Sequence, residues 1–132
     1  MDLHLTVGLT GEKREEVTEE KTAIRYGSGS VAVYATPAMV GLMEGAAMDV
    51  VAARLPEGMS TVGTELKIKH TAATPVGMAV RATAELVEVD GRRLVFAVKA
   101  FDEKEEIGVG THERFVVKVE KFLAKAEGKR VG

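Results

Sequence analysis

Four residue types are missing from this 132-residue chain: it has no cysteine, tryptophan, asparagine or glutamine. The lack of cysteine excludes disulfide bonds, thiolate nucleophiles and cysteine-based metal sites. Without side-chain amides, we expect the donors to an oxyanion among backbone N–H groups, Arg, His and hydroxyl groups. Scarce amides beside many Glu and Lys residues also resemble the composition of heat-adapted proteins.

No charge of one sign dominates, since 18 basic residues face 20 acidic ones. This balance predicts no nucleic-acid partner, which a basic face would indicate. No apolar run is long enough to span a membrane and no signal peptide opens the chain, so we expect one cytoplasmic domain over residues 1–132 without a membrane partner. Three dispersed histidines form no metal-binding motif, and no phosphate-binding loop is present, so neither a metal nor a cofactor is expected.

The longest apolar stretch runs from Tyr34 to Gly58 and is typical of a buried helix. Thr36 before Pro37 predicts the start, with Thr36 as the N-cap, and Leu55-Pro56 predicts the end. Many of its apolar residues are Gly or Ala, which lets other chains approach closely. A helix that is apolar all round needs more cover than one small sheet provides, so a second copy of the chain is expected to supply the rest.

Alternating apolar residues predict strands on both sides of this helix. The first is expected over residues 3–17, with the charged "GEKREEV" as its solvated end. Four strands follow the helix, two of them joined by a hairpin at Asp90-Gly91. The first of these four is expected to place five residues on one face: Val62, Thr64, Leu66, Ile68 and His70. The predicted fold class is α+β, a five-stranded antiparallel sheet wrapped around one long central helix, followed by a frayed tail.

Glu44 lies in the middle of the apolar helix. Its neighbours on the helix are apolar and cannot neutralise it, so burying its charge would be costly. Two interpretations stay open: the carboxylate escapes through a gap in the packing, or it is functional. Asp49 lies on another side of the helix near Arg54, and we interpret it as structural.

Two histidines are further candidates. His70 interrupts the apolar face of its strand, so it is either a satisfied core residue or a functional one. His112 shares a strand face with Arg114 in "GTHERF", and we interpret this cluster as solvated charge rather than as a site.

The segments "ATPAMVGLMEGAAM", "TVGTELKIKHTAATPVG", "DGRRLVFAVKAFD" and "GTHERFVV" resemble the hotdog-fold thioesterases of the fluoroacetyl-CoA thioesterase type. The resemblance covers about residues 8–117. It implies a hotdog fold and a homodimer, or a dimer of dimers, whose sheets pair side by side. It also implies acyl-CoA sites at the dimer interface.

The family's Thr, Glu and His motif falls on Thr36, Glu44 and His70, which the resemblance therefore implies are catalytic. It implies that Gly63 and Arg114 position the thioester or the water. One difficulty is the distance along the helix. Glu44 lies about 12 Å beyond Thr36 at 1.5 Å per residue, so direct contact needs a bend or residues from both subunits.

Fluoroacetyl-selective members of this family have an aromatic lid just before the Thr, where this chain has "GSGSVAV". The sequence therefore predicts an acyl-CoA thioesterase without a marked preference for fluoroacetyl-CoA. Two alternatives stay open: a hotdog hydratase or dehydratase, and a non-catalytic acyl-CoA-binding module.

Overall fold

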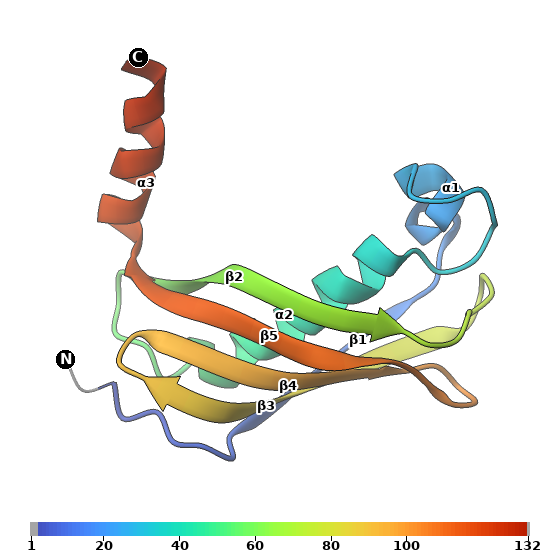
Figure 1. Ribbon diagram of the computed structural model, residues 1–132, viewed down its shortest axis with the longest axis horizontal. Coiled ribbons are helices and arrows are strands. Elements are labelled where there is room, and N and C mark those ends of the chain that lie inside the picture. Colours follow the sequence, from blue (N-terminus) through green and yellow to red (C-terminus); the bar gives the residue numbers. More distant parts are fainter. Residues whose placement is uncertain (1–2, 132) are drawn as a thin grey trace.

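Five antiparallel strands form one curved sheet in the computed structural model, which describes residues 3–131 (Figure 1). Their order across the sheet is β1-β3-β4-β5-β2. The strands are β1 (Thr10–Glu16), β2 (Met59–His70), β3 (Ala79–Asp90), β4 (Arg93–Phe101) and β5 (Glu106–Lys118). The predicted hairpin joins β3 to β4, and Gly91 in its turn has a φ of 61°, a conformation that favours glycine.

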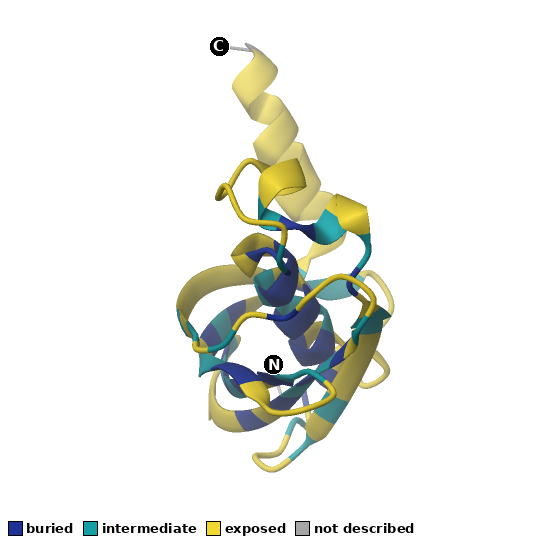
Figure 2. Cartoon of the chain, turned by 90° about the vertical axis from the view of Figure 1, so that its right-hand side faces the viewer, coloured by how far each residue is buried: buried dark blue, intermediate teal, exposed yellow. Residues whose placement is uncertain are grey.

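The long helix α2 (Thr36–Ala52) lies against one face of this sheet, and the buried core is between them (Figure 2). Its core side carries eight buried residues: Ala38, Met39, Leu42, Met43, Ala46, Ala47, Val50 and Val51. They meet fully buried strand residues such as Leu86, Phe96 and Val98. The predicted α+β hotdog architecture is therefore confirmed.

One stripe of α2 stays uncovered by the sheet. It includes Gly41 and Met48, which are exposed, and Val40 and Glu44, which are partly exposed. A Cβ atom added at Gly41 would meet no atom within 4 Å. The single chain thus leaves the predicted gap in the cover of its helix.

The start of α2 differs from the prediction in one respect. Ala35 is the N-cap, without a side-chain hydrogen bond, and Thr36 is the first residue of the helix. The N-cap role predicted for Thr36 is wrong because its hydroxyl group is engaged with His70 instead. The helix also ends at Ala52, before the predicted Leu55-Pro56.

The first strand was predicted too early. Residues 3–9 lie outside any strand, and β1 is the segment interpreted above as a solvated end. Gly8 has a φ of 102°, a conformation unsuited to a strand. Leu3 instead packs its side chain into the core. The charged residues can form β1 because β1 is an edge strand, and an edge strand exposes much of its surface.

A β-bulge in β2 changes which side chains face the helix. The pairing of β2 with β5 shifts between Gly63 and Glu65, so that Gly63 lies opposite Arg114 and Leu66 lies opposite His112. Residues directly opposite each other in an antiparallel pair share a face, so Gly63 and Leu66 both face α2. The predicted assignment of β2 residues to one face is therefore right after the bulge and wrong before it, because the extra residue reverses the alternation.

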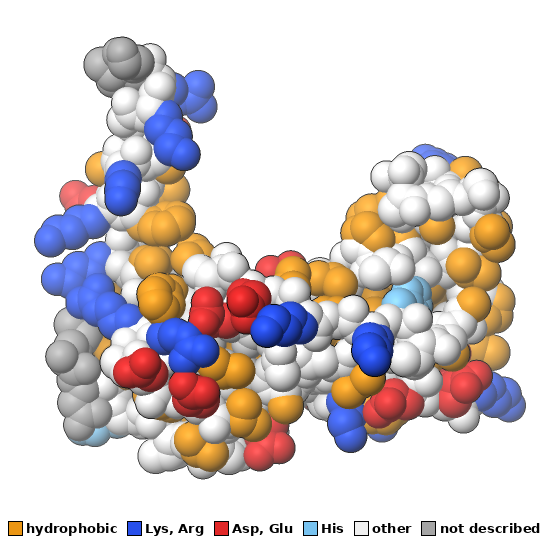
Figure 3. Space-filling model, viewed as in Figure 1, with side chains coloured by type: hydrophobic (Ala, Val, Ile, Leu, Met, Phe, Trp, Pro, Cys, Tyr) orange, Lys and Arg blue, Asp and Glu red, His pale blue; other side chains and the backbone are white. Residues whose placement is uncertain are grey.

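Short helices lie at both ends of the sheet. They are η1 (Glu19–Lys21), α1 (Ala23–Tyr26), α3 (Val119–Glu127) and η2 (Gly128–Val131). The helix α3 was not predicted. Both α1 and α3 rise beyond the edge strand β2, leaving a hollow between them (Figures 1 and 3). None of the helices within residues 3–131 is long and apolar enough to cross a membrane.

Candidate active site

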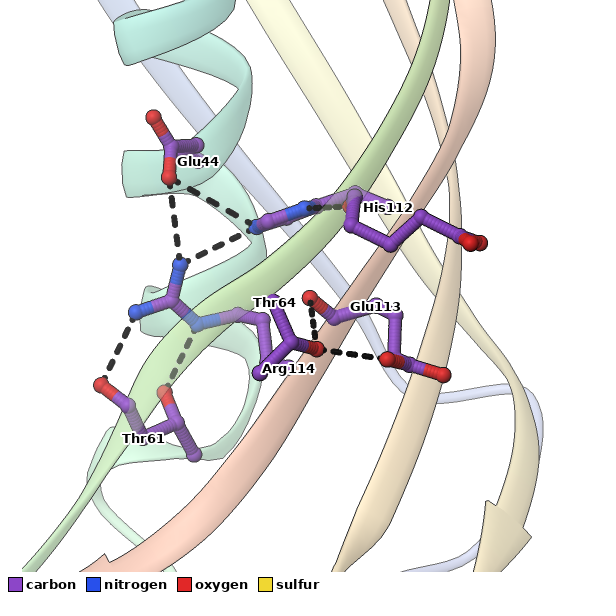
Figure 4. A network of polar contacts seen from close by, with 7 residues as sticks. Glu44, Thr61, Thr64, His112, Glu113 and Arg114 are labelled. Carbon is purple, nitrogen blue, oxygen red and sulfur yellow. Dashed lines mark hydrogen bonds and ion pairs between the residues drawn. The ribbon is translucent and has the colours of Figure 1, made fainter.

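Glu44 faces two basic side chains that project from β5 (Figure 4). Its Oε2 atom lies 3.8 Å from Arg114 Nη1 and 3.9 Å from His112 Nε2. The Glu44 side chain keeps 38% of its surface exposed. The neighbours of Glu44 on its own helix cannot neutralise it, as expected, and its partners come from the sheet instead.

The guanidinium of Arg114 is held by three hydrogen bonds. Its Nε donates to Thr61 Oγ1 at 2.8 Å and its Nη2 donates to the Thr61 carbonyl at 2.9 Å. Its Nη1 donates to His112 Nε2 at 3.0 Å. Burial lowers the pKa of Arg114 while the Glu44 carboxylate opposes that change, and the group stays charged at neutral pH. Arg114 is thus a fixed cation aimed at Glu44.

His112 is buried, with 1% of its surface exposed, so the prediction of a solvated cluster is wrong. Its Nδ1 donates to the Glu65 carbonyl at 2.9 Å, which leaves Nε2 as an acceptor for Arg114. Burial lowers the pKa of His112, and the Arg114 cation acts in the same direction. His112 is therefore a neutral imidazole that orients Arg114.

Gly63 lies beside this cluster for a steric reason. A Cβ atom added there would lie 2.8 Å from Glu44 Oε2 and 3.0 Å from His112 Cε1. Any larger residue would push the carboxylate away from its present position. Glycine at position 63 therefore lets Glu44 and His112 lie close against the backbone of β2.

A second polar pair lies at the beginning of α2 and the end of β2. Thr36 Oγ1 is 2.7 Å from His70 Nδ1. The other ring nitrogen of His70 is buried and has no hydrogen-bond partner among residues 3–131. Burial lowers the pKa of His70, partly offset by the Ala72 backbone. The pair borders a cavity of 360 Å³ whose other lining residues include Ala23, Ser28 and Val33.

The backbone next to Thr36 is anchored by a buried tyrosine. The Tyr34 hydroxyl donates to Glu15 Oε2 at 2.5 Å, and Lys21 Nζ lies 2.6 Å from Glu15 Oε1. Burial raises the pKa of Tyr34, so the phenol stays protonated and donates. This network connects β1 to the segment directly before α2.

The five predicted site residues therefore fall into two groups. Glu44, Gly63 and Arg114 lie together, and Thr36 lies with His70. Within one chain α2 runs unbroken between Thr36 and Glu44, which keeps these two residues about 12 Å apart along its axis.

Sequence reasoning missed two members of the first group, Thr61 and His112. The position of His112, two residues before Arg114 on one strand, was the available signal. Asp49 is exposed and makes no ion pair with Arg54 among the residues described. Residues 3–131 also contain no group of three acidic or histidine side chains that could hold a metal ion.

Comparisons with known proteins agree on one family. The family model described as "Fluoroacetyl-CoA-specific thioesterase" matches residues 17–120. A fluoroacetyl-CoA thioesterase from Streptantibioticus cattleyicolor is 52% identical over 97 residues, which cover 74% of this chain and 70% of that protein.

Solved structures give the same result. A crystal structure of a fluoroacetyl-CoA thioesterase is similar with a TM-score of 0.89 and 43% identity, covering 95% of this chain and 97% of the other. A thioesterase superfamily member from Thermus thermophilus has a TM-score of 0.84 and 30% identity, covering 96% of this chain and 92% of the other.

Proposed function

Because the chain belongs to the family of fluoroacetyl-CoA-specific thioesterases and is an acyl-CoA thioesterase, we propose that it hydrolyses small acyl-CoA thioesters at a site built around Glu44. One observation carries this proposal: the Glu44 carboxylate faces the fixed Arg114 cation, and Gly63 lets that carboxylate lie close against β2. A carboxylate and a fixed cation next to each other are what hydrolysis of a carbonyl group requires.

Glu44 and Arg114 have complementary roles in this reaction. Their separation of 3.8 Å is too long for a direct hydrogen bond, so both groups remain available to a third oxygen atom. Glu44 accepts a proton from water while the water oxygen bonds to the thioester carbon. Arg114 stabilises the negative carbonyl oxygen. The carbon–sulfur bond then breaks, and the proton passes to the CoA sulfur. Direct attack by Glu44 on the carbonyl is the other route that this geometry permits.

His112 acts through Arg114 and does not contact the substrate. Its neutral Nε2 accepts a hydrogen bond from Arg114 Nη1, which fixes the direction of the guanidinium. A protonated His112 would lose this acceptor. The role of His112 is therefore to position the cation.

We expect the active protein to be a dimer. The edge strand β2 is 12 residues long and pairs within residues 3–131 only with β5. A long free edge normally recruits another chain. Two apolar side chains are also exposed, Leu66 on β2 and Met48 on the uncovered stripe of α2. A second copy paired along β2 would cover both.

Antiparallel pairing of two β2 strands would also join the two groups of site residues. It places the end of one strand, at His70, beside the first half of the other strand, which contains Gly63. His70 follows the same alternation as Leu66, so it lies on the helix side of the sheet, as Gly63 does. The partner subunit's Thr36 and the partner subunit's His70 would then face Glu44 across the interface.

The acyl group is expected to be small. The cavity beside Thr36 and His70 measures 360 Å³ and is bordered by Ala23, Ser28 and Val33. This volume lies near the lower end of the usual range for ligand pockets, about 300–1,000 Å³.

A mixed dimer tests the proposal. Glu44→Gln and His70→Ala variants carry different affinity tags and are mixed, and release of CoA from acetyl-CoA is followed by thiol trapping. If the site is shared, the mixed dimer contains one intact site, and about half of the parental activity returns. If each site lies within one chain, both sites stay broken and no activity returns. Absence of CoA release from the parental protein with every acyl-CoA tested would overturn the function itself.

A further inference from the structure

A second cluster of charged side chains lies where β5 meets α3, and the reaction described above does not use it. A cavity of 290 Å³ is present there. Four basic residues line it: Arg92, Lys118, Lys121 and Lys125. Phe122 and two valines complete the lining, and no acidic residue takes part. Figure 3 shows basic side chains gathered along α3 and at its base.

These four cations lack partners within the described part of the chain. None of them makes a side-chain hydrogen bond or an ion pair with residues 3–131. Lys121 and Lys125 are four residues apart on α3, so their like charges lie side by side and repel each other. The chain as a whole carries a net charge of −2, so this concentration of positive charge is local. Such a cavity is suited to a ligand with several negative charges.

The position of the cavity relative to the reaction site limits the choice of ligand. Lys118 lies four residues beyond Arg114 on β5, which corresponds to about 13 Å along the strand. A substrate that reacts at Arg114 and is anchored at Lys118 must therefore be long, with its reactive group at one end and its charges at the other. CoA thioesters have this form, because the pantetheine arm separates the thioester from the phosphorylated adenosine.

We propose that the cavity between β5 and α3 binds the 3′-phosphoadenosine diphosphate part of CoA, an inference that rests on the proposed function. Lys118, Lys121 and Lys125 contact its phosphate groups, together with Arg92. Phe122 keeps 44% of its surface exposed and offers an aromatic face to the adenine ring. The helix α3 is therefore a binding element for the nucleotide, although it contributes nothing to the reacting atoms.

The test compares Lys121→Glu with Lys104→Glu, which changes the net charge equally in the exposed turn between β4 and β5. Both positions are exposed, so both variants are expected to fold. Acetyl-CoA and acetyl-pantetheine, which lacks the nucleotide, serve as substrates. Lys121→Glu raises KM for acetyl-CoA about tenfold, the effect of losing one charge-assisted hydrogen bond. Its kcat and its KM for acetyl-pantetheine stay unchanged, and Lys104→Glu matches the parent with both substrates.

Calorimetry with CoA and with adenosine 3′,5′-bisphosphate separates this inference from the proposed function. Neither titration needs turnover. If Lys121→Glu weakens binding of both ligands and Lys104→Glu does not, the nucleotide site stands, even for a protein that releases no thiol. If the parent hydrolyses acetyl-CoA while KM and both affinities are unchanged in Lys121→Glu, the nucleotide site is wrong and the thioesterase stands.

Discussion

The two groups of site residues are held in different ways. Arg114 is fixed by three hydrogen bonds from two strands, and its neighbour His112 by a fourth. The Thr36–His70 pair has one hydrogen bond and a buried ring nitrogen without a partner among residues 3–131. The first group is therefore held by several hydrogen bonds within one chain, whereas the second is held by one. In the shared site that we propose, the first group supplies the rigid half and the second group supplies the half that meets another chain.

The largest expected effect comes from Glu44, in the first group. Glu44→Gln keeps the size of the side chain and removes its charge, so turnover of acetyl-CoA falls by roughly 10²–10⁴, the usual contribution of a general base. The variant folds as the parent does, because the Glu44 side chain is partly exposed. Steady-state kinetics and light scattering measure both properties. Asp49→Asn, an exposed carboxylate on the same helix, is the control, and parental activity in Glu44→Gln would show that the carboxylate is structural.

Gly63→Ala tests whether the position of the Glu44 carboxylate matters as much as its charge. The new Cβ atom lies 2.8 Å from Glu44 Oε2, so the carboxylate must move. A displacement of this kind lowers kcat by up to about 100-fold. Gly128→Ala is the matched control, since an added Cβ meets no atom within 4 Å there. Equal kinetics in the two variants would remove Gly63 from the site.

Protonation of the buried histidines gives a smaller effect, on stability. Burial lowers the pKa of His70 and His112 below 6.5, so the unfolded chain takes up protons first as the pH falls. Their contribution to stability is complete above pH 6.5 and is lost below it. Between pH 6.5 and about pH 5.5, each histidine lowers the free energy of unfolding by at most about 1 kcal/mol.

Urea unfolding at several pH values measures this dependence. His112→Gln should show a shallower loss of stability over that range than the parent, since one titrating group is gone. The carboxyl groups of Asp102 and Glu113, with pKa values held below 3.8 and 4.5, contribute only at lower pH. An identical pH dependence in parent and variant would mean that His112 titrates normally.

The smallest expected effect lies beside the Thr36–His70 pair. The loop before Thr36 is rich in glycine and serine and is exposed, and it carries no aromatic ring between Gly27 and Val33. We therefore expect similar kcat/KM values for fluoroacetyl-CoA and acetyl-CoA in a parallel assay. A ratio above about 100 in favour of the fluorinated substrate would contradict this.

The elements that the sequence predicts well are those with strong local patterns. The α2 start at Thr36-Pro37 and the turn at Asp90-Gly91 depend on a few adjacent residues. The turn is in the expected place, and the helix starts one residue before the expected position. The position of β1 does not follow the alternation of apolar residues. An edge strand accepts charged side chains, and leucines can pack into a core without belonging to a strand. Local periodicity cannot distinguish these cases.

The site was predictable in part, and the reason differs by residue. Glu44 was conspicuous because an apolar helix has few charges. Its partners could not be found by helical spacing, since they come from a strand about 70 residues later in the chain. His112 looked solvated beside Glu113 and Arg114, and only the pairing of β5 with β2 shows that it is buried. The catalytic roles of Thr36, Glu44 and His70 remain predictions.

The bulge in β2 also determines which changes in length this strand tolerates. Thr64 is the extra residue between Gly63 and Glu65, and its hydroxyl donates to Glu113 on the side of the sheet away from α2. Deleting Thr64 would restore strict alternation without turning either half of the strand over, because Gly63 would stay opposite Arg114 and Leu66 opposite His112. Gly63 and His70 would therefore still share a face. One residue added between Gly63 and His70 would instead turn one half of the strand over, so this strand tolerates a deletion at the bulge better than an insertion.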